Sequence, residues 1–260
     1  MFEIKFIGNQ HTNRSDRGKH VPFVIVNHIS SGSMGSMDNW FTSPTNKVSS
    51  AHFGISKDGR IHQYVKIEDI AWHCGIKIDS IKNATAKVVK DMNINPNAYC
   101  IGIEHEGTDG ELTPIQLEAS IWLHQYIKNY IKDKYDKDVP FDEYHVIGHC
   151  HIDPKRKPNC PGPKFPWTTI YSTLKEYDEE MSIKDDFEKL QKTVQELVEE
   201  NNQLQNKLNN IEELMKLDTI PTWAKDAVDK AVKSGLIKDP KGGSQDFYRI
   251  ITVLHRKGLL

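Results

Sequence analysis

The chain has 260 residues, and its 34 lysines and arginines against 36 aspartates and glutamates give a formal net charge of −2. General nucleic-acid binders carry a basic surplus, so this balance argues against that class. No apolar run approaches the roughly 18 residues of a membrane span, and we expect no membrane insertion. At about 150 residues per domain, the length predicts one or two domains.

The N-terminal segment and the cysteines bear on where the protein is made. The first twenty residues lack the apolar segment of a secretory signal peptide, so we expect no signal peptide. The four cysteines, Cys74, Cys100, Cys150 and Cys160, are too few and too scattered for a disulfide scaffold. We therefore expect synthesis in a reducing cytoplasm, where a cysteine can serve as a thiolate ligand.

Residues 1–178 alternate between strand and helix patterns. The expected strands are residues 22–30, a hairpin over 49–65 that turns at Asp58 and Gly59, and residues 98–107 and 143–149. The expected helices are residues 113–135, with Thr113 as N-cap and Pro114 in the first turn, and residues 167–181. Strands that alternate with helices predict an α/β domain, in which helices pack over one sheet.

Residues 179–218 carry a heptad pattern. The apolar positions, spaced by three and four, are Phe187, Leu190, Val194, Leu197, Leu204, Leu208, Ile211 and Met215. Asn201 is a single polar a position, which in two-stranded coiled coils fixes the register. Lys207 at g would face Glu212 at e of a parallel partner. We expect a linker that forms a parallel homodimeric coiled coil; the alternative is one amphipathic helix folded back on the N-terminal domain.

Residues 219–260 predict a small helical module. One apolar stripe runs from Pro221 to Ala231, and Gly235 followed by Leu236 has the form of a Schellman C-cap. A second stripe follows the turn at residues 239–245. About 40 residues rarely bury a sufficient core alone, so we expect this module to lean on a second copy.

Three potential metal ligands stand at the ends of predicted elements. His28 ends the first strand, His149 ends the last strand, and Cys160 follows eleven residues later. Zinc accepts imidazole and thiolate, and a catalytic zinc site keeps three protein ligands and one open position. Spacing alone leaves Cys150 open as a rival to Cys160, and His151 as a competing ligand.

The ordered motifs of this region resemble a known family. They read VIVNHIS, VSSAHFGISKDGRIHQYV, AWHCG, CIGIEHEG and GHCHIDPKRKPNCPGP. Together, from about residue 20 to about residue 170, they resemble the zinc-dependent N-acetylmuramoyl-L-alanine amidases, which are related to phage amidase lysozymes and peptidoglycan recognition proteins. The resemblance implies a central mixed β-sheet flanked by helices, with a bound Zn²⁺.

The resemblance also implies roles for individual residues. His28, His149 and Cys160 match the three zinc ligands. Glu104 matches the general base of one branch of the family; the other branch uses a tyrosine at the position of Ala51. Periodicity alone leaves Glu106 an equal candidate, because residues 104 and 106 share one face of a strand.

Two further positions are implied in the same way. Lys157 matches the lysine that stabilises the oxyanion. Two residues, rather than the family's usual one, separate it from Cys160, so Lys155 remains a rival. His73, in AWHCG, matches a position that lines the substrate groove.

The implied reaction is hydrolysis of the amide bond between the lactyl group of N-acetylmuramic acid and L-alanine of the peptidoglycan stem peptide. Residues 219–260 loosely resemble a surface-layer-homology repeat, which implies binding to a cell-wall polymer. We therefore expect a phage or prophage endolysin, held in the host cytoplasm until lysis and then acting on the wall. The alternatives are a cytosolic muropeptide-recycling amidase and a non-catalytic peptidoglycan-binding protein.

Overall fold

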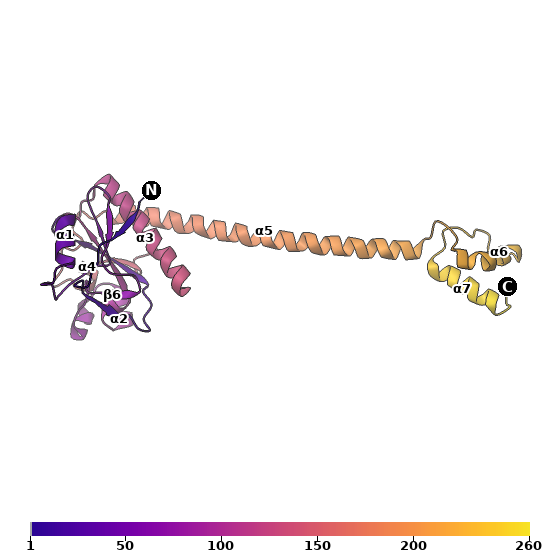
Figure 1. The fold of residues 1–260 in the computed structure, drawn as a ribbon, viewed down its shortest axis with the longest axis horizontal. Helices are drawn as coiled ribbons and strands as arrows, with labels where there is room; N and C mark the ends of the chain where they lie inside the picture. Colours follow the sequence, from indigo (N-terminus) through magenta and orange to yellow (C-terminus); the bar gives the residue numbers. More distant parts are fainter. Residues whose placement is uncertain (1) are drawn as a thin grey trace. The chain divides into compact units, whose positions relative to one another are not determined.

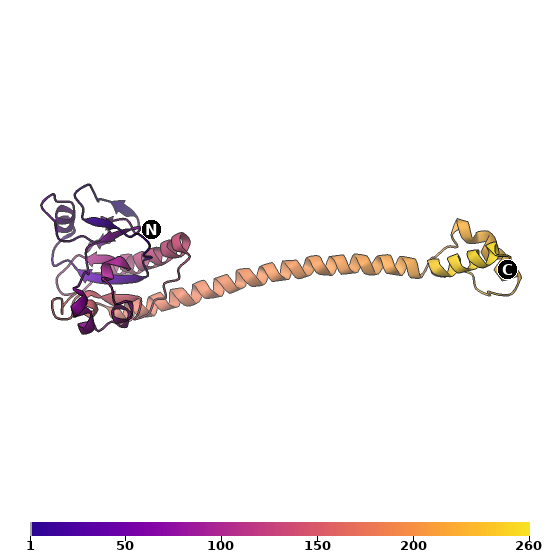
Figure 2. The ribbon, with the colours of Figure 1, turned by 90° about the horizontal axis from the view of Figure 1, so that it is seen from below.

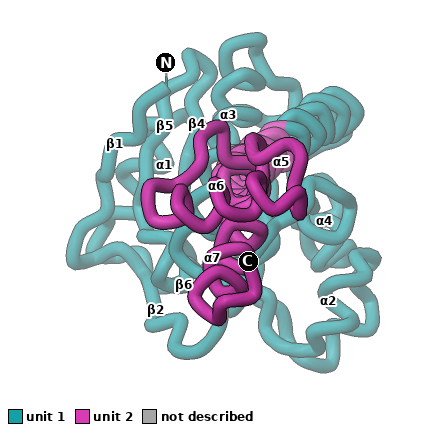
Figure 3. The backbone as a smooth tube through the Cα atoms, turned by 90° about the vertical axis from the view of Figure 1, so that its right-hand side faces the viewer, with its two compact units in different colours: residues 1–183 teal, residues 184–260 magenta. Residues whose placement is uncertain are grey.

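The computed structural model describes residues 2–260, which fall into two compact units, residues 1–183 and 184–260 (Figure 3). The boundary lies inside one continuous helix, α5 (Trp167–Met215). The sequence suggested two separate segments here, but it contains no glycine or proline between residues 167 and 215, so nothing interrupts the helix.

The first unit is built on a six-stranded sheet in the order β1-β5-β4-β7-β3-β8. The strands are β1 (Ile4–Phe6), β3 (Val24–Ile29), β4 (Phe53–Ile55), β5 (Ile61–Gln63), β7 (Cys100–His105) and β8 (Val146–Gly148). Only β4 and β5 pair antiparallel; the other neighbours are parallel. The expected central mixed sheet is therefore confirmed. A separate antiparallel pair joins β2 (Arg14–Asp16) and β6 (Asp69–Ala71).

Helices cover both faces of this sheet (Figure 1, Figure 2). They are α1 (Met34–Phe41), α2 (Lys87–Met92), α3 (Pro114–Tyr135), α4 (His149–Ile152) and the short 3₁₀ helices η1 (Ile78–Asn83) and η2 (Pro96–Ala98). One core packs α3 and the first turns of α5 on the sheet through residues such as Ile25, Ile101 and Leu123. A second core packs η1 and α2 on the opposite face, against Val24 and Val26.

Most of the expected elements of this unit are confirmed. The hairpin forms from β4 and β5, and Gly59 supplies the left-handed turn residue at φ +84°. Helix α3 begins where predicted, and its N-cap Thr113 Oγ1 accepts a hydrogen bond from the Gln116 N–H at 3.2 Å. The segments β1, β2, β6, α1 and α2 were not predicted, since each is too short to show a period.

One expected placement is wrong. His149 does not end the last strand but begins helix α4. The ladder ends at Gly148, which is the N-cap of α4 and whose backbone N–H donates to Nδ1 of His151 at 3.1 Å.

The second unit comprises the C-terminal part of α5 with η3 (Thr222–Ala224), α6 (Lys225–Lys233) and α7 (Gln245–Arg256). Ala227, Val228 and Tyr248 belong to a small core shared by α6 and α7. The expected Schellman cap is present: Gly235 has φ +77°, and the Leu236 N–H donates to the Ala231 carbonyl at 2.9 Å. None of the helices described combines the length and the apolar character needed to cross a bilayer.

Candidate metal centre

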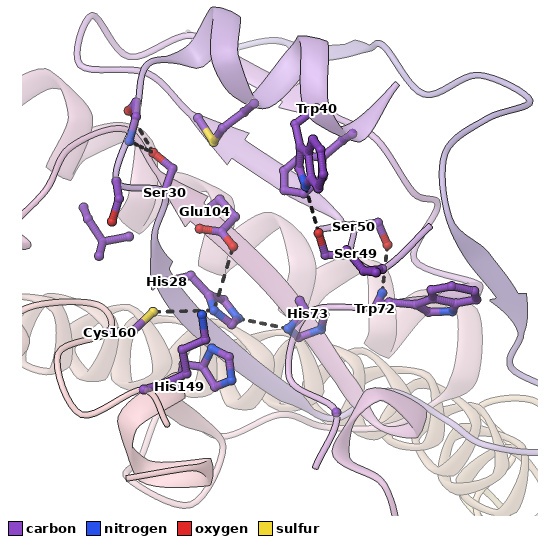
Figure 4. Close-up of a pocket in the computed structure, with 18 of the residues that line it drawn as sticks. His28, Ser30, Trp40, Ser49, Ser50, Trp72, His73, Glu104, His149 and Cys160 are labelled. Carbon is purple, nitrogen blue, oxygen red and sulfur yellow. Dashed lines mark hydrogen bonds and ion pairs between the residues drawn. The ribbon is translucent and has the colours of Figure 1, made fainter. Parts of the chain in front are cut away.

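Three side chains from distant parts of the sequence meet at one edge of the sheet (Figure 4). The β3–β8 ladder ends at the pair Asn27 and Gly148, so His28, the next residue of β3, and His149, the first residue of α4, both directly follow this pair. The loop between α4 and α5 brings in Cys160. The ligand atoms of the two histidines and the cysteine all lie within 4.8 Å of one another, and His28 Nδ1 is 3.7 Å from Cys160 Sγ.

The two rival ligands lie outside this cluster. His151 turns its ring toward Trp167, with 5.5 Å between the ring centroids, and its Nδ1 accepts from Gly148. Cys150 contributes its backbone N–H, which donates to the Cys160 carbonyl at 2.8 Å. Within residues 2–260, the two histidines and Cys160 form the one group of donors close enough together to share an ion.

The donor set fits a zinc ion. Burial lowers the pKa of His28 well below its usual value and that of His149 to about 4, so both rings stay neutral and keep a lone pair. Burial, together with the Glu104 carboxylate, raises the pKa of the Cys160 thiol to about 12. The thiolate therefore needs a compensating cation, which a divalent metal supplies. Two imidazoles and one thiolate leave the fourth tetrahedral position open.

A largely buried carboxylate faces the same cluster. Glu104 lies on β7 directly opposite His28 on β3, and its Oε1 is 3.9 Å from His28 Nδ1. Its other oxygen, Oε2, is buried and has no hydrogen-bond partner among the described residues. Burial raises the pKa of Glu104 to about 7, against the opposing effect of the Lys157 charge. An unpartnered buried oxygen beside three metal donors is placed to accept a proton.

The structure separates the two glutamates that periodicity left equal. Glu106 lies beyond the end of β7, and its Oε2 accepts from the Lys57 backbone N–H at 3.0 Å. His105, between them, points to the opposite face, where its Nε2 lies 2.9 Å from the Ser120 hydroxyl of α3. Glu104 alone of the three lines the cavity above the cluster.

This cavity, of about 700 Å³, also distinguishes the two lysines. Lys157 lines it, and Lys155 does not. The positive charge of Lys157 is close enough to lower the pKa of His149, after the larger effect of burial. The adjacent Arg156 also lines the cavity, but it pairs with Asp153 and donates to the Gly75 carbonyl at 3.1 Å.

Two tryptophans at the rim of the cavity were not singled out from the sequence. The indole N–H of Trp40 donates to Ser49 Oγ, and that of Trp72 donates to Ser15 Oγ, both at 2.9 Å. Trp40 is 45% exposed. With their polar atoms bonded inside the protein, the tryptophans present flat apolar surface to whatever enters. Trp40 has no periodic neighbours that would have marked it.

His73 lines the cavity as expected, but it also contacts a member of the cluster. Its Nδ1 lies 2.9 Å from Nε2 of His28 (Figure 4). No sequence pattern indicated this contact between residues that lie 45 positions apart.

One protein family matches the part of the chain that contains these residues. The sequence profile of the N-acetylmuramoyl-L-alanine amidase family matches residues 17–163, which include all six predicted site residues. The 1,6-anhydro-N-acetylmuramyl-L-alanine amidase AmpD of Haemophilus influenzae is 34% identical over 126 residues, which are 48% of this chain and 59% of the relative. N-acetylmuramoyl-L-alanine amidase A of Achromobacter lyticus is 29% identical over 165 residues, covering 58% of this chain and 82% of the relative.

Among solved structures, the crystal structure of a selenomethionine AmpD derivative matches with a TM-score of 0.50 and 25% identity. The match covers 67% of this chain and 95% of that one. The chain spans only between a half and three fifths of the length of the AmpD relatives matched by sequence.

The ligand assignment predicts that Cys160→Ala loses its metal. Removing a thiolate from a three-ligand site should lower zinc affinity by more than the about 10- to 100-fold typical of an outer hydrogen-bond partner. Zinc content is measured by mass spectrometry after dialysis, with Cys150→Ala as the matched control, which should keep its zinc. Equal zinc in Cys160→Ala and wild type would exclude this sulfur as a ligand.

Proposed function

Because the chain belongs to the N-acetylmuramoyl-L-alanine amidase family, we propose that it is a zinc-dependent hydrolase of peptidoglycan. The bond cut is the amide between the lactyl group of N-acetylmuramic acid and L-alanine of the stem peptide. The observation that carries the proposal is the convergence of His28, His149 and Cys160 beneath the unpartnered oxygen of Glu104, in an open cavity.

The ligands are suited to hold the ion firmly. A zinc ion on His28, His149 and Cys160 would act as a Lewis acid that polarises the scissile carbonyl and acidifies the attacking water. Both imidazoles remain neutral through burial, so they do not repel a cation at neutral pH.

Glu104 is the proposed general base. Its free Oε2 can accept a proton from the attacking water and later deliver one to the departing amine. A catalytic base works best when its pKa lies near the working pH, and burial raises that of Glu104 to about 7. A zinc ion held by the three ligands would lower this pKa again and favour the ionised form that the first proton transfer requires.

Lys157 is proposed to stabilise the oxyanion of the tetrahedral intermediate. Lys157 lines the same cavity as Glu104 and His149. Removing one such donor typically costs about 3–4 kcal/mol in the transition state. Lys155 lies outside the cavity and is not assigned this role.

Two biological settings fit this chemistry, and we propose the endolysin. It is supported by the second unit, which lies entirely beyond the region matched by the family. A recycling amidase is favoured by one specific observation, the 34% identity to AmpD, whose name states an anhydro-muramyl substrate. A non-catalytic binder is disfavoured because the three donors occur together with Glu104 and Lys157.

We propose that α5 pairs with a second copy of the chain. Its a and d side chains in the second unit are unpartnered: Phe187, Leu190, Leu197 and Leu204 are each close to 60% exposed. A stripe of this spacing matches the seam of a two-stranded coiled coil. Asn201, the single polar a residue, would pair with its mate and favour the parallel register.

The small module of residues 219–260 is proposed to bind a cell-wall polymer. It keeps large apolar side chains at its surface, with Trp223 47%, Ile250 60% and Val253 56% exposed. A dimer carries two such modules, and two linked weak sites on one polymer bind far more tightly than one.

The amidase proposal is tested by mass analysis of digested peptidoglycan. New alanine amino termini are expected, without new reducing sugar ends. New reducing sugar ends without new alanine amino termini would contradict the proposed reaction.

A comparison of two substrates, soluble anhydro-muropeptide and intact sacculi, distinguishes the endolysin from the recycling amidase. Faster cleavage of sacculi supports the endolysin, and activity on the soluble substrate alone supports recycling.

Glu104→Gln should keep zinc and lose turnover. Glutamine preserves the shape of the side chain but cannot accept the proton, so kcat should fall by about 10²–10⁴. Glu106→Gln is the matched control and should retain near wild-type kcat, because the Glu106 carboxylate accepts from the Lys57 backbone and does not line the cavity. A fall of kcat in Glu106→Gln alone would reverse the assignment.

The dimer is tested by light scattering at micromolar concentration, where the wild type should show twice the chain mass. Serine at both d positions Leu197 and Leu204 should give the monomer mass, because it removes apolar area from the seam. Serine at the outward f positions Glu199 and Asn206 is the control and should leave the dimer intact. A monomeric wild type would refute the proposal.

A further inference from the structure

The imidazole of His28 is engaged on both of its nitrogens. Nδ1 faces the cluster, 3.7 Å from Cys160 Sγ and 3.9 Å from Glu104 Oε1. Nε2 lies 2.9 Å from Nδ1 of His73, and the two rings meet edge to face, with an interplanar angle of 84° (Figure 4). His28 is 1% exposed, so this contact is shielded from water.

The contact fixes where the protons must be. A neutral imidazole carries one proton, and a metal-binding nitrogen must offer its lone pair. If Nδ1 of His28 binds the ion, its proton stands on Nε2 and is donated to His73. Nδ1 of His73 must then accept, so His73 carries its own proton on Nε2.

His73 is itself held by its surroundings. Asn97 Oδ1 accepts the backbone N–H groups of His73 and Cys74, at 3.2 and 2.8 Å. The His73 ring lies against Gly102 in β7: a Cβ at this glycine would stand 2.6 Å from Cγ and Nδ1 of the ring. A glycine inside a strand commonly marks such a close approach. Here it makes the room that the ring occupies.

The support continues behind His73. The His52 ring packs edge-on against it, with 5.5 Å between centroids, and His52 Nδ1 accepts the Gly102 N–H at 3.0 Å. Behind His52 lies the buried guanidinium of Arg17, which donates to backbone carbonyls that include those of Ile67 and Asp69. Each polar group of this support has a partner, so the ring of His73 has little freedom to turn.

We propose that His73 is a positioning residue: it holds His28 in the tautomer and orientation that present Nδ1 to the metal, and Gly102 provides the space for it. The inference rests on the metal site of the proposed function. It gives His73 a role in addition to lining the substrate groove. Partners of this kind, when removed, typically lower metal affinity by about 10- to 100-fold.

The first experiment reads the tautomer in metal-free protein by two-bond ¹H–¹⁵N correlation of the histidine rings. Wild type should show His28 with its proton on Nε2, and His73→Ala should lose this single tautomer. The readout needs neither zinc nor substrate, so it is independent of whether the chain proves to be an amidase.

The second experiment measures zinc affinity by competition with a chelator, and the visible spectrum of the cobalt-loaded protein. His73→Ala should lose about 10- to 100-fold in affinity and alter the cobalt spectrum. His73→Gln, which can still accept a hydrogen bond, should recover part of the loss. Gly102→Ala should show the same loss of affinity although His73 itself is unchanged. Gly35→Ala is the control for this variant, because a Cβ at Gly35 has only Ser33 Oγ within 4 Å, at 3.9 Å.

The outcomes are separable. An unchanged tautomer or unchanged zinc affinity in His73→Ala, with only KM raised, would overturn the proposal and leave His73 a substrate contact. If His73→Ala does not fold, as judged by circular dichroism, His73→Gln and Gly102→Ala carry the test, and wild-type affinity in Gly102→Ala overturns it. A wild type that binds no zinc would instead refute the metal site itself.

Discussion

The parallel pairing of β3 with β7 is the constraint on which the site depends. It places His28 directly beside Glu104, and both side chains point to the same face of the sheet. The alternate pairs point to the other face, where Ile25 and Ile101 pack against α3. Because side chains alternate with a period of two, a slip of one residue would exchange the two faces. The apolar packing under α3 therefore fixes the register that assembles the chemistry on the opposite side.

Hydrogen bonding separates the structural histidines from the candidate ligands. Three buried histidines have both ring nitrogens within hydrogen-bond distance of protein groups: His52, His105 and His124. His28 differs from them because its Nδ1 faces the cluster itself, 3.7 Å from Cys160 Sγ and 3.9 Å from Glu104 Oε1. Beside it, Oε2 of Glu104 is buried without a hydrogen-bond partner among the described residues, although buried polar groups are normally satisfied. This unpartnered oxygen beside two imidazoles and a thiol is an observation, independent of family resemblance, that fits an ion-binding site.

The sequence predicted the frame better than the contacts within it. A continuous apolar run located β3, strand-like segments located β7 and β8, the turn at Asp58 and Gly59 located the hairpin, and helical spacing located α3. Strand periodicity could not choose between Glu104 and Glu106, since they share a strand face; only the end of β7 and the Lys57 contact separate them. The choice between Lys157 and Lys155 depended on the path of an irregular loop, for which no period exists.

The contact between His73 and His28 shows why the side-chain contacts of the site could not be predicted from the sequence. It joins side chains 45 residues apart, and neither segment carries a pattern that specifies its partner. One signal was present: Gly102 lies inside strand β7, between Ile101 and Ile103, and a glycine there weakens the strand unless something must approach closely. The glycine could have indicated a neighbour, although not its identity.

The long helix raises a separate energetic question. Of the 49 residues of α5, only Ile170 and Leu174 are buried, and both belong to the first unit. Most helical stability in proteins comes from packing an apolar face rather than from intrinsic propensity. Beyond residue 183 that face is present but exposed, and a single asparagine interrupts it at an a position. Burial of an Asn201 pair weakens a coiled coil but penalises other registers, so its presence makes sense if a second copy covers the stripe. Pairing would thereby bury the exposed stripe of α5 and bring two copies of the module of residues 219–260 together.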